Sequence, residues 1–301
     1  AVLLVAGANP AYDAPSAFDI PGALAKVGTI VSLGDRLDET TMLADLLAPT
    51  SHPFECWGDQ TLPRGLAAIQ QPVIQPLFDT RGLLDVLVDW AAALGDPAAI
   101  AAVAAATAPV PAPSPATAER ARSTSLAWHY LRAAWATRLA LDPATPAFDA
   151  QWNELLRVGW WQGPAPVAAP RVLQPTALAL FGTAPAAATG LELQLYPHLA
   201  HADGRRGNNA WLHELPDPVT RLTWGGALSI APRRFDEMGL ENGDLIEVDA
   251  GHGTIVAPAY RHAGMHYDQV ALPLGLGRTA CGVIGNGVGV NAFPLRQLAN
   301  G

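Results

Sequence analysis

The pattern of apolar residues changes near Leu191, and this change constrains the fold more than any other feature of the chain. Before it, apolar runs of strand length alternate with stretches at helical spacing. Such alternation predicts a mainly parallel sheet with covered faces. After it, short β-type runs are separated by glycine and proline, which favours a closed barrel over an open sheet. The sequence therefore predicts an α/β layer followed by a β-barrel domain.

The amino-terminal part carries the clearest strand and helix signals. Val2–Ala6 and Thr29–Leu33 predict buried strands, and Pro21–Lys26 predicts a short helix with proline in its first turn. Apolar residues at helical spacing predict two further helices, over Asp38–Leu47 and Leu83–Leu94.

Two stretches rich in proline and alanine, 108–118 and 163–190, interrupt the pattern. Between them we expect one helix over Ala118–Leu141, ending at Asp142-Pro143, and a second with Thr145 as its N-cap. We therefore divide the chain into an α/β domain (1–107), a linker with two helices (108–190) and a β-barrel (191–301). The predicted β runs of the last part are 191–196, 227–231, 244–250, 253–260 and 269–274, with a helical turn at Phe235–Leu240 and a tight turn at Asn242-Gly243.

Composition excludes several classes of function. The net charge of -9 argues against binding a nucleic-acid backbone. Two cysteines, Cys56 and Cys281, are too few for a cysteine-ligated iron–sulphur cluster within this chain, and sequence alone cannot decide whether they pair. The histidines are scattered, so we expect no metal site. No run of eighteen strongly apolar residues occurs. The chain lacks an initiator methionine, and we expect that residues upstream were removed, by truncation rather than by processing.

Several motifs resemble the molybdopterin-dinucleotide oxidoreductase superfamily. "MGLENGDLIEVDAGHGTIVAPAYRHAGMHYDQVALPLG" (Met238–Gly275) and "GNGVGVNAFPLR" (Gly285–Arg296) resemble its carboxy-terminal barrel. "VAGANPAY" (Val5–Tyr12) resembles its nucleotide-cradling turn, and "DETTMLADLLAPTSHPFECWGD" (Asp38–Asp59) resembles the segment that leads into a further turn. The resemblance implies a barrel of double-psi type that caps a pterin, with asparagine-bearing loops near the guanine-nucleotide ends.

Three details are similar to a narrower family, the molybdopterin-like subunit of alternative complex III, a bacterial quinol:electron-acceptor oxidoreductase. They are the segment "NNAWLHELPDPVTRLTW", the loop "GNGVGVNAF", and the Trp-Gly-Asp of "HPFECWGD", which stands where catalytic members of the superfamily tend to have Gly-Thr. This resemblance implies a non-catalytic scaffold that has lost the cofactor and has no metal of its own. It also implies iron–sulphur clusters on another part, further subunits of a respiratory complex, and a peripheral position on the periplasmic side of the bacterial inner membrane. The alternative is a fragment of a true bis-molybdopterin-guanine-dinucleotide oxidoreductase.

The candidate cofactor-binding residues are polar side chains in turns. Asn9 follows a predicted strand and could lie beside a phosphate, or simply serve a tight turn. Glu39 and Thr40 could contact ribose or guanine, or Thr40 or Asp38 could cap the following helix. Four asparagines match positions where active relatives contact pterin or nucleotide, yet amides also serve turns. They are Asn208, Asn209, Asn286 and Asn291.

Other reactive or aromatic residues have simpler interpretations. Ser51, His52 and Glu55 are too close in sequence to form a hydrolytic triad. We interpret Cys56 as a packing residue. Trp211 and Trp224 could either contact a partner or hold their own loop against the barrel, and the sequence leaves both alternatives open.

Overall fold

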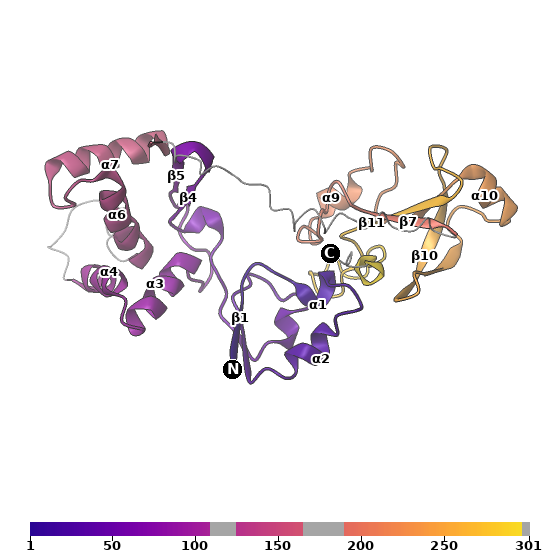
Figure 1. Cartoon of the computed structure of the whole chain (residues 1–301), viewed down its shortest axis with the longest axis horizontal. Helices are drawn as coiled ribbons and strands as arrows, with labels where there is room; N and C mark the ends of the chain where they lie inside the picture. The colour runs from indigo at the N-terminus through magenta and orange to yellow at the C-terminus, as the bar shows by residue number, and fades with distance from the viewer. Residues whose placement is uncertain (109–124, 165–189, 297–301) are drawn as a thin grey trace, which may run out of the picture. The chain divides into compact units, whose positions relative to one another are not determined.

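The computed structural model describes residues 1–108, 125–164 and 190–296 (Figure 1). The chain divides into two units: Ala1–Leu47 with Val172–Gly301, and Ala48–Arg171. This division differs from the linear boundaries that the sequence predicts, because the first 47 residues group with the β-rich end. Most of the two stretches rich in proline and alanine lies outside the described residues.

A small parallel sheet begins the first unit. Its strands, in order, are β1 (Val2–Val5), β2 (Thr29–Ser32) and β3 (Leu46–Leu47). The first two confirm the predicted strands. The predicted short helix is also confirmed, as α2 (Ile20–Leu24), in which Pro21 occupies the first turn. A further helical turn, α1 (Pro10–Asp13), follows β1 and again begins at a proline.

The helix predicted over Asp38–Leu47 is wrong. Only Thr41–Leu43 (η1) form a single 3-10 turn, which Asp38 caps by accepting a 2.7 Å hydrogen bond from the Thr41 N–H. The chain then enters β3, because the Asp45 carboxylate accepts from the Ile30 N–H at 2.8 Å and ties the segment to β2. Most of the apolar side chains that suggested a helix are exposed and cover no core.

A mixed five-stranded sheet forms the β-rich end of the first unit (Figure 1). Its order is β7 (Glu192–Pro197), β11 (Gln269–Leu274), β8 (Leu228–Ile230), β10 (Thr254–Arg261) and β9 (Leu245–Asp249). The pairs β11–β7 and β10–β8 are parallel, whereas β11–β8 and β10–β9 are antiparallel. All five predicted β runs are confirmed. The pairings define a mixed sheet and do not show a double-psi barrel.

Buried apolar residues of the sheet form the core of this part. Ile230, Leu272 and Ala257 are nearly inaccessible to solvent, and Phe235 packs on them from α10 (Pro232–Glu237). The helical turn is therefore confirmed, although it begins three residues earlier than predicted. The tight turn after it is also confirmed, since Gly243 has a φ of +98°.

The second unit combines helices with an antiparallel sheet that the sequence reading missed. Its helices are α3 (Leu83–Ala93), α4 (Pro97–Thr107), α6 (Leu126–Leu139) and α7 (Pro146–Val158). Its strands are β4 (Gly58–Thr61), β5 (Leu66–Gln70) and β6 (Trp160–Gln162), in that order. Two short 3-10 turns, η2 (Pro53–Glu55) and η3 (Pro63–Gly65), flank β4. Trp135, Phe148 and Trp152 fill the core between helices and sheet.

The helix predictions for this unit are largely confirmed. Residues 118–124 of one predicted helix lie outside the described residues, and α6 accounts for the rest. It ends at Leu139, because Ala140 adopts a left-handed conformation with a φ of +54°. Thr145 caps α7 as predicted, accepting from the Phe148 N–H at 3.4 Å. No single described helix is long and apolar enough to cross a membrane; α3 and α4 would suffice only together, and they meet at a bend of 112°.

Candidate functional site

Two neighbouring strand ends of the first unit bring three of the candidate residues together. Asn9 follows β1, and Glu39 and Thr40 follow β2, which is its parallel partner. The Asn9 amide nitrogen donates to Glu39 Oε2 at 2.7 Å. Its oxygen accepts from the Thr40 N–H at 3.0 Å and from the Thr40 hydroxyl at 2.6 Å. The Asn9 amide therefore holds the two loops together.

The Glu39 carboxylate is the centre of this site, and Arg278 is its main partner. Arg278 Nε lies 2.9 Å from both carboxylate oxygens, and its Nη2 lies 2.7 Å from Oε2. The Thr279 and Ala280 N–H groups also donate to Oε1, at 2.8 and 3.0 Å. Both side chains are buried, with 11% of Glu39 and 7% of Arg278 exposed. This is a buried, bidentate ion pair between residues 239 positions apart.

The remaining hydrogen bonds of Arg278 join it to other loops of the first unit. Its Nη1 donates to the Gly204 carbonyl at 2.8 Å and its Nη2 to the Ala280 carbonyl at 3.0 Å. Its guanidinium lies 4.8 Å from the centre of the Tyr12 ring, whose hydroxyl donates to the Leu276 carbonyl. The guanidinium therefore satisfies its donors within the protein.

The pKa values of this site follow from these contacts. Burial alone would raise the pKa of Glu39, but hydrogen bonds from Arg278, Ala280 and Asn9 outweigh it and lower that pKa to about 2. Burial raises the pKa of Tyr12 above its usual value, and it also raises the pKa of the Cys281 thiol. Glu39 is therefore charged at neutral pH, whereas Tyr12 and Cys281 are neutral.

The four candidate asparagines hold turns rather than converge on one point. Asn286 accepts from the Cys281 N–H at 2.8 Å, and Asn209 accepts from the Leu212 N–H as N-cap of α9 (Ala210–Glu214). Asn208 accepts from the Ile284 N–H at 3.3 Å. Asn291 accepts from the Phe293 N–H at 3.0 Å and donates to the Tyr12 carbonyl at 3.1 Å.

Sequence reasoning missed Arg278 and Tyr12. The available signal was the position of Arg278 in "LGLGRTACG", where it is a lone charge among glycine and apolar residues. Such a residue is often buried against a carboxylate, but nothing in the sequence pairs it with Glu39.

Four aromatic rings of the segment that connects β7 to β8 lie in contact one after another. The centres of the His198 and His201 rings are 5.1 Å apart, those of His201 and His213 are 4.2 Å apart, and Trp224 stacks on His213 at 5.1 Å. Burial, together with the neighbouring His213 and His198, lowers the pKa of His201 to about 4. The stacking of Trp224 on His213 holds the Trp224 loop in place. Trp211, in contrast, is 83% exposed.

The polar group in the second unit builds a turn and is not arranged for catalysis. His52 Nδ1 accepts from the Phe54 N–H, Glu55 accepts from the His52 N–H at 2.9 Å, and the Ser51 hydroxyl contacts Thr80. The contacts of His52 and Glu55 form the capping box of η2. The nearby Cys56 is a free, half-buried thiol whose pKa is raised by burial and by neighbouring carboxylates. Among the described residues, no group of three or more His, Cys, Asp or Glu could hold a metal ion.

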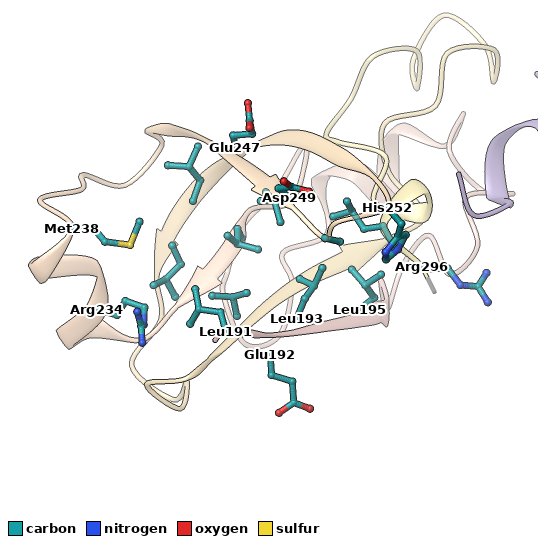
Figure 2. A pocket seen from close by; sticks show the side chains of 17 residues that line it. Leu191, Glu192, Leu193, Leu195, Arg234, Met238, Glu247, Asp249, His252 and Arg296 are labelled. Atoms are coloured by element: carbon teal, nitrogen blue, oxygen red, sulfur yellow. The ribbon is translucent and has the colours of Figure 1, made fainter. Parts of the chain in front are cut away.

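A hollow of about 870 Å³ lies on the five-stranded sheet, and Figure 2 shows the side chains that line it. Leucines of β7 point into it, and Arg234 and Met238 lie at one end and His252 and Arg296 at the other. Glu192 and Glu247 point away from it. The hollow is therefore lined mainly by apolar side chains, and Asp249 is a further charged residue of its lining.

Comparisons with known proteins found a partial sequence match and a similar fold. No protein-family model matches the chain. Over 104 residues the chain is 36% identical to the molybdopterin-binding-like subunit of menaquinone reductase from Nitratidesulfovibrio vulgaris, a match that covers 33% of this chain and 15% of that protein. Its fold is similar to that of acetylene hydratase from Pelobacter acetylenicus, with a TM-score of 0.59 and 13% identity, over 97% of this chain and 40% of that chain. The chain thus spans only a part of either protein. The sequence match thus links about a third of the chain to a molybdopterin-binding-like subunit, and the structural similarity shows the fold alone.

Proposed function

We propose that this chain is a cofactor-free scaffold in a respiratory quinol:electron-acceptor oxidoreductase complex of the alternative complex III type. It supports electron transfer through iron–sulphur clusters carried elsewhere and makes or breaks no bond itself. The similarity to a molybdopterin-binding-like subunit of a menaquinone reductase supports this class of complex. The five-stranded mixed sheet is, in this proposal, the counterpart of the superfamily's double-psi barrel.

The observation that carries the proposal is the hydrogen bonding of Glu39. A carboxylate that contacts ribose or guanine must keep an oxygen free for the ligand. Here both oxygens are occupied by Arg278, Asn9 and two backbone N–H groups. Asn9 and Thr40, the other candidates at this edge, bond to each other. The polar groups at the strand ends therefore fasten the α/β layer to the β-rich part instead of facing a nucleotide.

The proposal also includes a cellular location for the chain and the kind of partner that the chain binds. The chain is peripheral, on the periplasmic side of the bacterial inner membrane, and it contacts other subunits of the complex.

Metal and pterin analysis of the intact protein tests this proposal. The protein is purified from its native membranes, molybdenum and tungsten are measured by mass spectrometry, and pterin is measured by fluorescence after oxidative release. We expect neither metal nor pterin in stoichiometric amount. A molybdopterin enzyme purified from the same cells is the control for cofactor supply. Stoichiometric metal with pterin would refute the scaffold and favour the bis-molybdopterin-guanine-dinucleotide alternative.

A further inference from the structure

An open hollow beside α9 concentrates positive charge on an acidic chain. It has a volume of about 680 Å³. Its lining residues are Arg36, Arg205, Arg206, Asn208, Asn209, Ala210, Trp211, Leu212 and Ile284. This lining includes three arginines and no carboxylate, although the chain has a net charge of -9. The hollow therefore complements an acidic ligand.

The three arginines differ in their pairing. Arg36 lies 3.4 Å from the neighbouring Asp35, and Arg205 pairs with Asp203. Arg206 forms no ion pair with any described residue. Its guanidinium is therefore the one positive charge of the hollow that is available to an incoming carboxylate.

Apolar side chains adjoin this charge on the surface. Trp211 is 83% exposed and Ile284 is 41% exposed, and both line the hollow. Val283, next to Ile284, is 96% exposed. The Asn208 side chain bonds to the Ile284 N–H and so holds the two loops side by side. Exposed tryptophan and aliphatic residues beside arginine are typical of the central residues of protein interfaces.

A protein segment fits this surface better than a small anion does. The amide oxygens of Asn208 and Asn209 accept backbone N–H groups, so both side chains serve to hold their own loops. A phosphate in the hollow would leave Trp211 and Val283 in water. A peptide that carries both carboxylates and apolar side chains would cover the tryptophan and valine and pair with Arg206.

We propose that Arg206, Trp211, Val283 and Ile284 form a docking surface for an acidic segment of a partner subunit. This proposal rests on the proposed scaffold function, because it assumes an assembled complex. It identifies the partner by its chemistry: aspartate or glutamate to face Arg206, and an apolar residue to cover Trp211.

Photo-crosslinking in the intact complex tests the docking surface. Trp211→p-benzoylphenylalanine is introduced into the full-length protein in its native membranes, and irradiation is followed by mass spectrometry. We expect an adduct with an acidic segment of a different polypeptide. Adding Arg206→Glu should lower the adduct yield about tenfold, because attraction becomes repulsion. The matched control is Arg157→Glu, at an exposed arginine of α7, which should leave the yield unchanged.

Three results would overturn the docking surface: no adduct, an adduct only within the same polypeptide, or a yield insensitive to Arg206→Glu. Loss of the adduct on adding guanosine diphosphate would assign the hollow to a nucleotide and would also overturn it. In each case the protein can still co-purify with its complex, which leaves the scaffold proposal intact. A protein that sediments without any partner contradicts both proposals.

Discussion

Removing the charge of Glu39 is expected to loosen the contact between the α/β layer and the loop after β11. In Glu39→Gln, the buried Arg278 guanidinium loses its anionic partner, although its other hydrogen bonds remain. The pKa of Glu39 falls from 4.5 to about 2 in the folded protein, which corresponds to about 3 kcal/mol of differential stabilisation of the charged form. Breaking one side of a buried pair typically costs about 3–5 kcal/mol, so the two magnitudes agree.

Hydrogen exchange of the intact protein measures this loss locally. The peptides that carry the Thr279 and Ala280 amides, both donors to Glu39, should lose about a hundredfold of their protection, the equivalent of about 3 kcal/mol. The matched control is Asp236→Asn, which breaks an exposed bidentate pair with Arg261 in the same unit. We expect little change there, since exposed pairs contribute weakly.

The pH dependence gives the same prediction a second test. Because the folded pKa of Glu39 is depressed, its stabilisation is fully present above the unfolded value of 4.5 and is lost as the pH falls toward about 2. Protection of the Thr279 amide should therefore decline over this window in the wild type and stay flat in Glu39→Gln. A variant with unchanged protection at neutral pH would refute the fastening role and reopen Glu39 as a ligand contact.

Three further predictions concern the same unit and the helix end in the second. The pKa of His201 is lowered to about 4, so folding should lose about 3 kcal/mol as the pH falls from about 6.5 to 4, and His201→Phe should remove this dependence in acid denaturation. Gly282→Ala should destabilise by about 1–3 kcal/mol in urea melts, because its φ is +112° and the new Cβ would meet the Asn208 amide. The control Gly251→Ala, with positive φ but open space, should cost less. Ala140→Gly should raise stability by up to about 1 kcal/mol, since this alanine has a φ of +54°.

The strands and longer helices could be predicted from the sequence because their signals are local. Thr145 before Pro146 predicts a helix start, and the structure has that cap. The helix prediction for Asp38–Leu47 was wrong. Its apolar residues have helical spacing, but Asp45 binds the backbone of β2 and the chain continues as a strand. That competing contact is tertiary, and the local spacing of apolar residues does not reveal it.

The candidate site could be predicted only in part, for a similar reason. Asn9, Glu39 and Thr40 lie together because two predicted parallel strands end at the same edge. Their actual partner, Arg278, is 239 residues from Glu39. Neither the periodicity nor the spacing of residues in the sequence could predict a contact over this separation. The grouping of residues 1–47 with the β-rich end was missed for the same reason.

The loop after β11 connects the buried site with the exposed surface. Its first part directs Arg278 inward to Glu39, and its later part presents the exposed Val283 and Ile284, the latter held by Asn208. Between them, the Cys281 N–H is fixed by Asn286, and Gly282 leaves no space for a larger side chain beside Asn208. A loop that is fastened at this many points within one turn presents its apolar tip in a defined orientation, which lowers the ordering cost when a partner binds. Asn208 and Asn286, which the sequence suggested as cofactor contacts, thus hold in place the surface that we propose to receive a protein.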